Sequence, residues 1–211
     1  MEEYKVNSEL LEVLNNEGVC KTIAMQKYAK ENFIPVLRPN TASLLISFIR
    51  ATKPKLILEI GTAIGYSGTL ILENAPKDAI LHTIEKEEAN VVIARENFEK
   101  LGFKNVKIFE GDAIDVLTNL VEPYDFIFLD GPKAQYINYL PHLIRLLKTG
   151  AVLFSDNVLY RGMVFSREEP PAKKRSIVKN LQKFLEEITS SAELKTQIID
   201  IEDGVSISIK G

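Results

Sequence analysis

Oxygen-bearing side chains follow two apolar runs in the middle of the chain. Asp130 ends the run YDFIFLD, and Asp156 and Asn157 end the later run AVLFSDN. Because the carboxyl ends of parallel strands hold ligands at one edge of an open α/β sheet, we expect these three side chains to lie close together. Carboxylate and carbonyl oxygens are the ligands that hard divalent cations such as Mg²⁺ take in proteins. The pattern therefore predicts a small-molecule site with a hard metal ion.

A glycine-bearing turn, GTAIGYSG at residues 61–68, follows a third apolar run. It is not the GxGxxG motif of dinucleotide-binding proteins, and it lacks the lysine of a phosphate-binding P-loop. Its glycines allow a sharp turn beneath a nucleoside, for which an acidic residue about 20 positions on is the expected partner of the ribose hydroxyls. Glu85 stands 20 residues after Gly65. Asp112 and the backbone of Ala113 could line an adenine, although an aspartate in this place equally well caps the following helix.

The elements that must position these residues alternate along the chain. Strands are predicted at residues 56–61, 80–85, 106–112, 124–130 and 151–156. Helices are predicted between them at residues 66–73, 87–101, 113–120 and 135–147. Such alternation predicts βαβ units and a parallel sheet. After a further helix with an apolar stripe from Ile177 to Ile188, strands at 194–201 and 205–209 are joined by a tight turn at 202–204, so the last strand should run antiparallel.

Composition predicts one globular α/β domain over residues 1–211, because the chain has 211 residues and 45% hydrophobic content. Residues 1–52 look helical, with breaks at Pro35 and Pro39, and we expect them to cap the site or form a dimer face; residues 53–211 would form the core. No apolar run approaches the roughly 20 residues that span a bilayer, and the amino terminus is acidic. We therefore expect a cytoplasmic protein without membrane contact. The single cysteine, Cys20, excludes an internal disulfide.

The net charge of −3 is unevenly distributed, and residues 161–183 are basic. This segment carries Arg161, Arg167, Lys173, Lys174, Arg175, Lys179 and Lys183 against Glu168 and Glu169. A basic segment of this kind attracts phosphate, or it forms the solvated face of an amphipathic helix.

Several strings together resemble the metal-dependent class I O-methyltransferases of the catechol and caffeoyl-CoA type. They are EIGTAIGYS, IE, GDA, FLDxxK and SDNVL, and the resemblance covers nearly the whole chain. Within this family, PYDFIFLDGPKAQY, DNVLYRGMV, KKRSIV and the ending DGVSIS are similar to the bacterial enzymes that methylate 5-hydroxyuridine at the wobble position of tRNA. The resemblance implies S-adenosylmethionine as cofactor, a Rossmann-like sheet of seven strands with the last one antiparallel, and a homodimer.

The resemblance also implies roles for individual residues. The implied cofactor-binding residues are Val36, Glu59, Gly61, Tyr66, Ser67, Glu85, Asp112, Ala113 and Asp130. Glu59 and Gly61 would lie beside the methionine moiety, which Tyr66 and Ser67 would cover. Asp130, Asp156 and Asn157 match the ligands of Mg²⁺ or another divalent cation. Lys133 matches the general base, and a neighbouring metal cation would favour its neutral amine.

The acceptor is left open by the metal site, because 5-hydroxyuridine presents the same pair of neighbouring oxygens as a catechol. The basic segment favours the anticodon loop of tRNA, whose phosphates Arg161, Lys173, Lys174 and Arg175 would contact. Gly131, Pro132 and Ala134 differ from the alanine-rich version of this loop that we associate with the tRNA enzymes. A methyltransferase of catechol-like or CoA-linked phenols is the alternative. A nucleotide-binding oxidoreductase or a non-catalytic Rossmann module is a third hypothesis.

Overall fold

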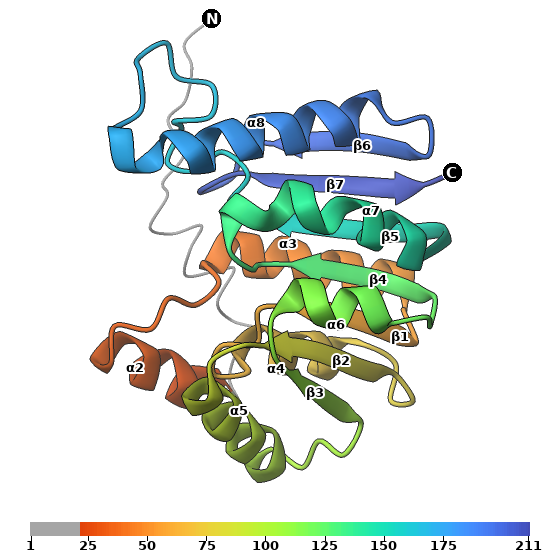
Figure 1. Ribbon diagram of the computed structural model, residues 1–211. Coiled ribbons are helices and arrows are strands. Elements are labelled where there is room, and N and C mark those ends of the chain that lie inside the picture. The colour runs from red at the N-terminus through yellow and green to blue at the C-terminus, as the bar shows by residue number, and fades with distance from the viewer. Residues whose placement is uncertain (1–21) are drawn as a thin grey trace, which may run out of the picture.

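The computed structural model describes residues 22–211, which form a seven-stranded sheet in the order β3-β2-β1-β4-β5-β7-β6. The strands are β1 (Leu56–Ile60), β2 (Ile80–Glu85), β3 (Val106–Glu110), β4 (Tyr124–Leu129), β5 (Leu147–Asp156), β6 (Leu194–Ile199) and β7 (Val205–Lys210). Strands β1 to β5 pair in parallel, whereas β7 pairs antiparallel with both β5 and β6 (Figure 1). The predicted sheet with an antiparallel last strand is confirmed. Cys20 and the first part of the expected helical cap lie outside the described residues.

Helices cover both faces of the sheet. They are α2 (Ile23–Glu31), α3 (Pro39–Thr52), α4 (Tyr66–Asn74), α5 (Glu88–Lys100), α6 (Ala113–Asn119), α7 (Tyr136–Leu146) and α8 (Arg175–Ser190), with 3₁₀ turns η2 (Lys133–Gln135) and η3 (Ala172–Lys174). In Figure 1, α6, α7 and α8 lie in front of the sheet, and α3 and α4 lie behind it. Each face therefore has its own hydrophobic core.

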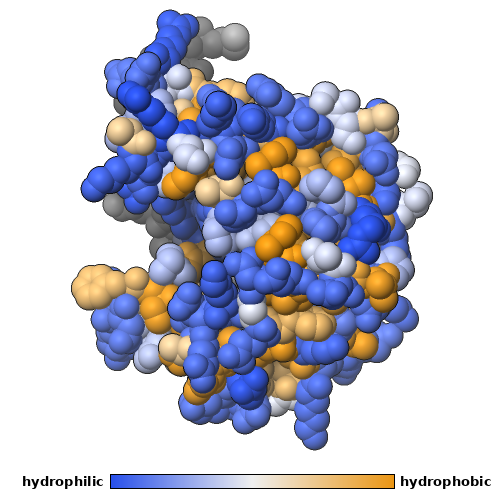
Figure 2. Space-filling model, in the orientation of Figure 1, coloured by the Kyte–Doolittle hydropathy of each residue, from blue (hydrophilic) through white to orange (hydrophobic). Residues whose placement is uncertain are grey.

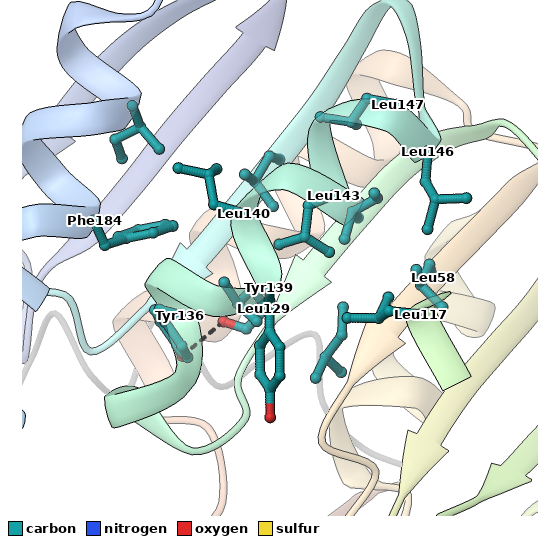
Figure 3. Close-up of a cluster of buried hydrophobic side chains, with 14 of the residues drawn as sticks. Leu58, Leu117, Leu129, Tyr136, Tyr139, Leu140, Leu143, Leu146, Leu147 and Phe184 are labelled. Carbon is teal, nitrogen blue, oxygen red and sulfur yellow. Dashed lines mark hydrogen bonds between the residues drawn. The ribbon is translucent and has the colours of Figure 1, made fainter. Parts of the chain in front are cut away.

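In the front core, α7 and α8 pack against side chains from β1, β2, β4 and β5. Helix α8 buries Val178, Leu181, Phe184, Leu185 and Ile188, the spacing that places side chains on one helical face. Its Phe184 ring packs edge-on against Tyr136 of α7, with the ring centroids 5.4 Å apart (Figure 3). The Tyr136 hydroxyl lies 3.1 Å from the carbonyl oxygens of both Leu129 and Asp156. This core thus ties together the carboxyl ends of β4 and β5.

Helix α3 belongs to the layer behind the sheet, because its buried side chains Thr41, Ala42, Leu45 and Ile49 recur at helical spacing. Pro39 is the first residue of this helix, where a missing N–H costs nothing. The chain before it, rather than α3 itself, reaches the carboxyl edge of the sheet. No helix within residues 22–211 is long and apolar enough to cross a membrane.

Several predicted strand boundaries were wrong, and β6 ends at Ile199 and not at 201. Strand β3 ends at Glu110 and not at 112, because Gly111 has a φ of +145° and Asp112 caps helix α6. Strand β5 begins at Leu147 and not at 151, since Leu147 pairs with Tyr124 across an irregularity in the register. The exposed residues 148–150 look like a turn in the sequence.

Candidate functional site

A cavity of about 800 Å³ opens at the carboxyl ends of β1, β2, β4 and β5. Parallel α/β sheets bind ligands at this edge. The predicted site residues that line it are Val36, Gly61, Tyr66, Ser67, Glu85, Asp112, Ala113, Asp130, Lys133, Asp156, Asn157 and Arg161. The structure therefore brings together most of the residues that the sequence singled out, although their roles stay predictions.

The glycine turn runs directly against the end of β4. Gly61 has a φ of +101°, which L side chains rarely adopt, and a Cβ atom there would clash with the carbonyl oxygen of Asp130. Its N–H donates to the carbonyl oxygen of Ile84 over 3.0 Å. Gly65, at φ +82°, is the N-cap residue of α4. Glycine is thus required at position 61 for the chain to pass between β2 and β4.

Glu59 is not among the residues that line the cavity, but its side chain is bonded to Ser67, which does line it, and its place beside the methionine moiety stays a prediction. Its side chain is fully buried, and its two carboxylate oxygens accept hydrogen bonds from Ser67 Oγ at 2.5 Å and Thr83 Oγ1 at 2.6 Å. The Thr62 hydroxyl lies 2.5 Å from that of Thr83. Burial raises the pKa of Glu59 to about 7 against the pull of these hydrogen bonds. Glu59 therefore supports the cavity floor through Ser67.

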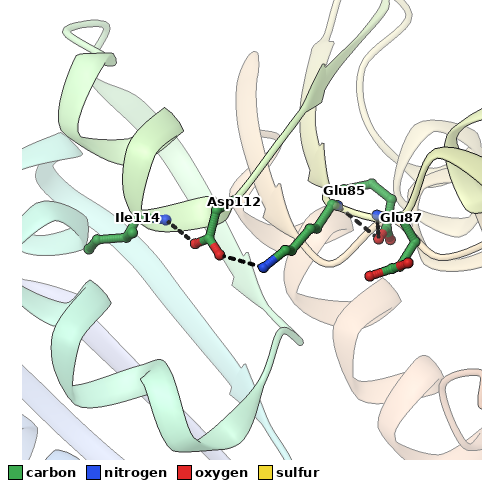
Figure 4. Close-up of polar contacts among 5 residues, drawn as sticks. Glu85, Glu87, Asp112 and Ile114 are labelled. Atoms are coloured by element: carbon green, nitrogen blue, oxygen red, sulfur yellow. Dashed lines mark hydrogen bonds and ion pairs between the residues drawn. The ribbon is translucent and has the colours of Figure 1, made fainter.

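Glu85 is held at the cavity rim by the main chain. Its Oε2 accepts from the N–H of Ala63 at 2.8 Å, and its Oε1 accepts from the N–H groups of Lys86 and Glu87, both at 2.9 Å (Figure 4). A carboxylate has about four lone-pair sites, so this arrangement leaves capacity for donors from a ligand. The glycine turn and the acid 20 residues after it thus form one unit.

Asp112 both lines the cavity and caps α6. Its predicted place beside an adenine and its role as a helix cap are therefore compatible. Its Oδ1 accepts from the N–H of Ile114 at 3.2 Å, and its Oδ2 accepts from Lys86 Nζ at 3.0 Å (Figure 4). The hydrogen bond from Lys86 lowers the pKa of Asp112 from its ordinary value. The Lys86–Asp112 pair spans the loops after β2 and β3 and was not foreseen from the sequence.

The ends of β4 and β5 bring Asp130, Lys133, Asp156 and Asn157 into the same cavity. Lys133, in the 3₁₀ turn η2, donates from Nζ to Asp130 Oδ1 over 2.7 Å, and both side chains are mostly buried. Asp156 is 4% exposed and accepts from the N–H of Asn157 at 2.6 Å. Burial and then the charge of Asp130 raise the pKa of Asp156 to about 7. Two carboxylates and an amide are therefore held together with one amine.

This arrangement fits a hard cation in its chemistry. Among residues 22–211, no three histidine, cysteine, aspartate or glutamate side chains are grouped to hold a metal ion. The predicted ligand set has only two carboxylates, and its third member is the Asn157 amide. A divalent cation would offset the burial and the charge of Asp130 that raise the pKa of Asp156, and the hard oxygen donors of this group suit Mg²⁺. Metal binding stays a prediction.

The predicted tRNA-binding residues are placed unevenly. Arg161 lines the cavity, whereas Lys173, Lys174 and Arg175 lie outside its walls. Lys174 Nζ lies 5.5 Å from the ring centre of Tyr160, which does line the cavity. The guanidinium of Arg175 is paired with Glu169 at 2.7 Å. Hydrophilic side chains dominate the surface over the segment before α8 and over the start of that helix (Figure 2).

Several cavity residues were not foreseen from the sequence. They include Arg38, Gln135, Tyr139, Tyr160 and Asp203. Arg38 and Arg161 both reach the cavity from segments far apart in the sequence. Arg38 precedes α3, and Arg161 follows β5. Pro35 and Pro39, which flank residues 36–38, were the only signal in the sequence that the chain is extended before α3.

The chain matches the family model described as "O-methyltransferase" over residues 5–211. A catechol O-methyltransferase of Niastella koreensis is 35% identical over 131 residues, which are 60% of this chain and 59% of that protein. The structure of a caffeoyl-CoA O-methyltransferase candidate from Staphylococcus aureus has a TM-score of 0.91 and 32% identity, covering 98% of this chain and 100% of that one. An O-methyltransferase of Streptomyces achromogenes involved in tomaymycin synthesis, solved in complex with SAM, has a TM-score of 0.77 and 27% identity, with coverages of 86% and 85%.

Proposed function

Because the chain belongs to the O-methyltransferase family, we propose that it transfers a methyl group from S-adenosylmethionine (SAM) to an acceptor hydroxyl with the help of a divalent cation. The observation that carries this proposal is the shared cavity. It joins a glycine turn and a main-chain-held Glu85 to the Asp130, Lys133 and Asp156 group.

The cofactor would occupy the side of the cavity nearest β1, β2 and β3. Glu85 would accept from the ribose hydroxyls, and Asp112 with Ala113 would flank the adenine. Gly61, Tyr66 and Ser67 would border the methionine moiety, with Glu59 beneath Ser67. Val36 would close this side from the segment before α3. A ligand-bound O-methyltransferase with the same fold supports SAM as the cofactor.

The acceptor would lie at the ends of β4 and β5. Asp130, Asp156 and Asn157 would hold Mg²⁺ or another divalent cation, which when bound would lower the pKa of an acceptor hydroxyl. Lys133 would take the hydroxyl proton on its Nζ, which Asp130 already orients at 2.7 Å. Transfer from a sulfonium is an in-line displacement, so the protein's main task is to align the acceptor oxygen with the methyl carbon.

For the acceptor we favour 5-hydroxyuridine in the anticodon loop of tRNA, giving 5-methoxyuridine at the wobble position. The support is a set of cationic side chains: Arg38 and Arg161 line the cavity, and Lys174 Nζ lies 5.5 Å from the ring centre of Tyr160, which also lines it. Phosphates of an anticodon loop would meet these side chains, whereas a free catechol has no phosphate for them to contact.

A catechol-like or CoA-linked phenol is the second candidate, favoured by a catechol O-methyltransferase among the relatives. Mass analysis of digested tRNA from a strain lacking this gene separates the two candidates. Unmethylated 5-hydroxyuridine should accumulate if tRNA is the acceptor, and unchanged 5-methoxyuridine would favour the phenol. Homodimer formation and a cytoplasmic location stay predictions, and sedimentation of the purified protein tests the first.

A further inference from the structure

We propose that Glu202 is a positioning residue that fixes two walls of the cavity relative to each other. One is the cofactor wall, residues 35–38, and the other is the acceptor loop, residues 157–161. Residues from both walls line the cavity, whereas Glu202 does not. The inference rests on the proposed placement of the cofactor and the acceptor.

Glu202 caps helix α3 from 161 residues away in the chain. Its Oε1 accepts from the N–H of Asn40 at 3.1 Å, and its Oε2 accepts from the N–H and the hydroxyl of Thr41 at 3.0 and 2.6 Å. Arg38, the residue at the cap position, makes no capping hydrogen bond of its own. A carboxylate at a helix N-terminus satisfies free N–H groups and complements the helix dipole. The cofactor wall, which leads directly into α3, is therefore anchored by Glu202.

The two residues after Glu202 hold the acceptor loop. The carbonyl oxygens of Asp203 and Gly204 accept from the N–H groups of Leu159 and Val158, both at 3.0 Å. Asp203 Oδ1 also accepts from the N–H of Arg161. Gly204 fits tightly against the Leu159 side chain, which a Cβ atom on Gly204 would overlap. Three consecutive residues of one turn thus hold both walls.

The acceptor loop and the turn that holds it have backbone conformations that need external support. The φ values of Asn157, Tyr160 and Arg161 are 56°, 47° and 57°. Glu202 itself has a φ of 52°. Non-glycine residues persist in this left-handed region only when the surroundings hold them. Loosening the Glu202 anchor should therefore release the acceptor loop as well as the start of α3.

The matched control is Asp125, which makes similar hydrogen bonds at the opposite end of the sheet. Its Oδ2 accepts from the N–H groups of Lys55 and Leu56 at 3.0 and 2.8 Å, and it does not line the cavity. Glu202→Gln and Asp125→Asn each replace one carboxylate by an amide of the same shape. A general loss of stability would affect both variants alike.

Amide hydrogen exchange of the full-length protein tests the proposal directly. In Glu202→Gln, we expect the amides of Val158, Leu159 and Arg161 to exchange at least fivefold faster than in the wild type, together with those of Asn40 and Thr41. In Asp125→Asn, all five should remain within twofold. If only Asn40 and Thr41 accelerate in Glu202→Gln, the residue merely caps α3 and the proposal is overturned.

Calorimetric binding of S-adenosylhomocysteine provides the second readout. We expect the Kd to rise about tenfold in Glu202→Gln and to stay within twofold in Asp125→Asn. An unchanged Kd in Glu202→Gln would contradict the anchoring of the cofactor wall. Failure of the wild type to bind S-adenosylhomocysteine would instead contradict the proposed function, and the exchange experiment would still decide the role of Glu202.

Discussion

Gly61 lies against the main chain of Asp130, so that a Cβ atom on Gly61 would stand 3.0 Å from the carbonyl carbon of Asp130 and clash with its oxygen. This close approach joins the proposed cofactor side of the cavity to the proposed metal side. The N–H of Asp130 in turn donates to the carbonyl oxygen of Ile60 over 2.9 Å. A change at Gly61 should therefore disturb both sides.

Gly61→Ala should weaken S-adenosylhomocysteine binding by at least tenfold and lower the free energy of unfolding. Gly150→Ala is the control, because Gly150 also has a positive φ, +79°, but has open space around it. Both substitutions incur the left-handed backbone cost of about 1–2 kcal/mol, whereas only Gly61→Ala adds the clash. Urea denaturation and calorimetry measure the two effects. Equal losses of stability and normal binding in both variants would contradict the close approach.

Glu59 should make the protein less stable as the pH rises. Its folded pKa of about 7 lies above its ordinary value of 4.5, so the folded state keeps a proton that the unfolded state releases between these values. The free energy of unfolding should therefore fall through this window, by on the order of 3 kcal/mol from this group. In Glu59→Gln this contribution is absent, so the variant should gain stability relative to the wild type between pH 5 and pH 8. A constant difference in urea denaturation across that range would show that Glu59 does not titrate there.

The meeting of Asp130, Asp156 and Asn157 could be predicted from the sequence, because parallel strands end at the same edge and each of these residues ends an apolar run. The hydrogen bonds of Glu59 to Ser67 and Thr83 could not be predicted from the sequence. Strand β1 is buried on both faces, so its sequence has no alternation to indicate which way Glu59 points. Its partners Ser67 and Thr83 lie 8 and 24 residues away.

Contacts between segments far apart in the chain could not be predicted from the sequence either. The carboxylate of Glu202 meets the N–H of Thr41 across 161 residues, and no local pattern marks either residue. Arg38 is likewise placed at the cavity by how the chain enters α3. Pairings of this kind depend on the complete tertiary fold.

Lys133→Ala should lower kcat at neutral pH by roughly 10² to 10⁴ and recover partly at higher pH, as the loss of a general base would. Lys133→Arg is the sharper variant, since an arginine can still pair with Asp130 but cannot act as a base. It should therefore be as inactive as Lys133→Ala while binding S-adenosylhomocysteine normally. A pH–rate profile of Lys133→Arg that matches the wild type would remove Lys133 from the mechanism.

A triple substitution of Lys173, Lys174 and Arg175 by alanine should raise KM for tRNA and leave turnover of a small catechol nearly unchanged. Its salt dependence for tRNA should flatten by up to about one log–log unit per lost phosphate contact. Alanine at Lys53, Lys77 and Lys104 is the control, because these residues precede β1, β2 and β3 at the opposite end of the sheet. Equal changes of KM for tRNA in the two triple variants would contradict phosphate binding by the basic segment, whose charges would then only form the solvated face of a helix.

Methyl transfer by the purified protein tests the central claim most directly. Unmethylated tRNA carrying 5-hydroxyuridine is incubated with labelled SAM and Mg²⁺, with excess chelator, or with Mg²⁺ and the Asp156→Ala variant. The proposed function predicts a labelled methyl group on the 5-oxygen only for the wild type with Mg²⁺, while S-adenosylhomocysteine affinity of the variant stays within about tenfold. Full turnover in chelator or by Asp156→Ala would contradict the role of the Asp130, Asp156 and Asn157 group.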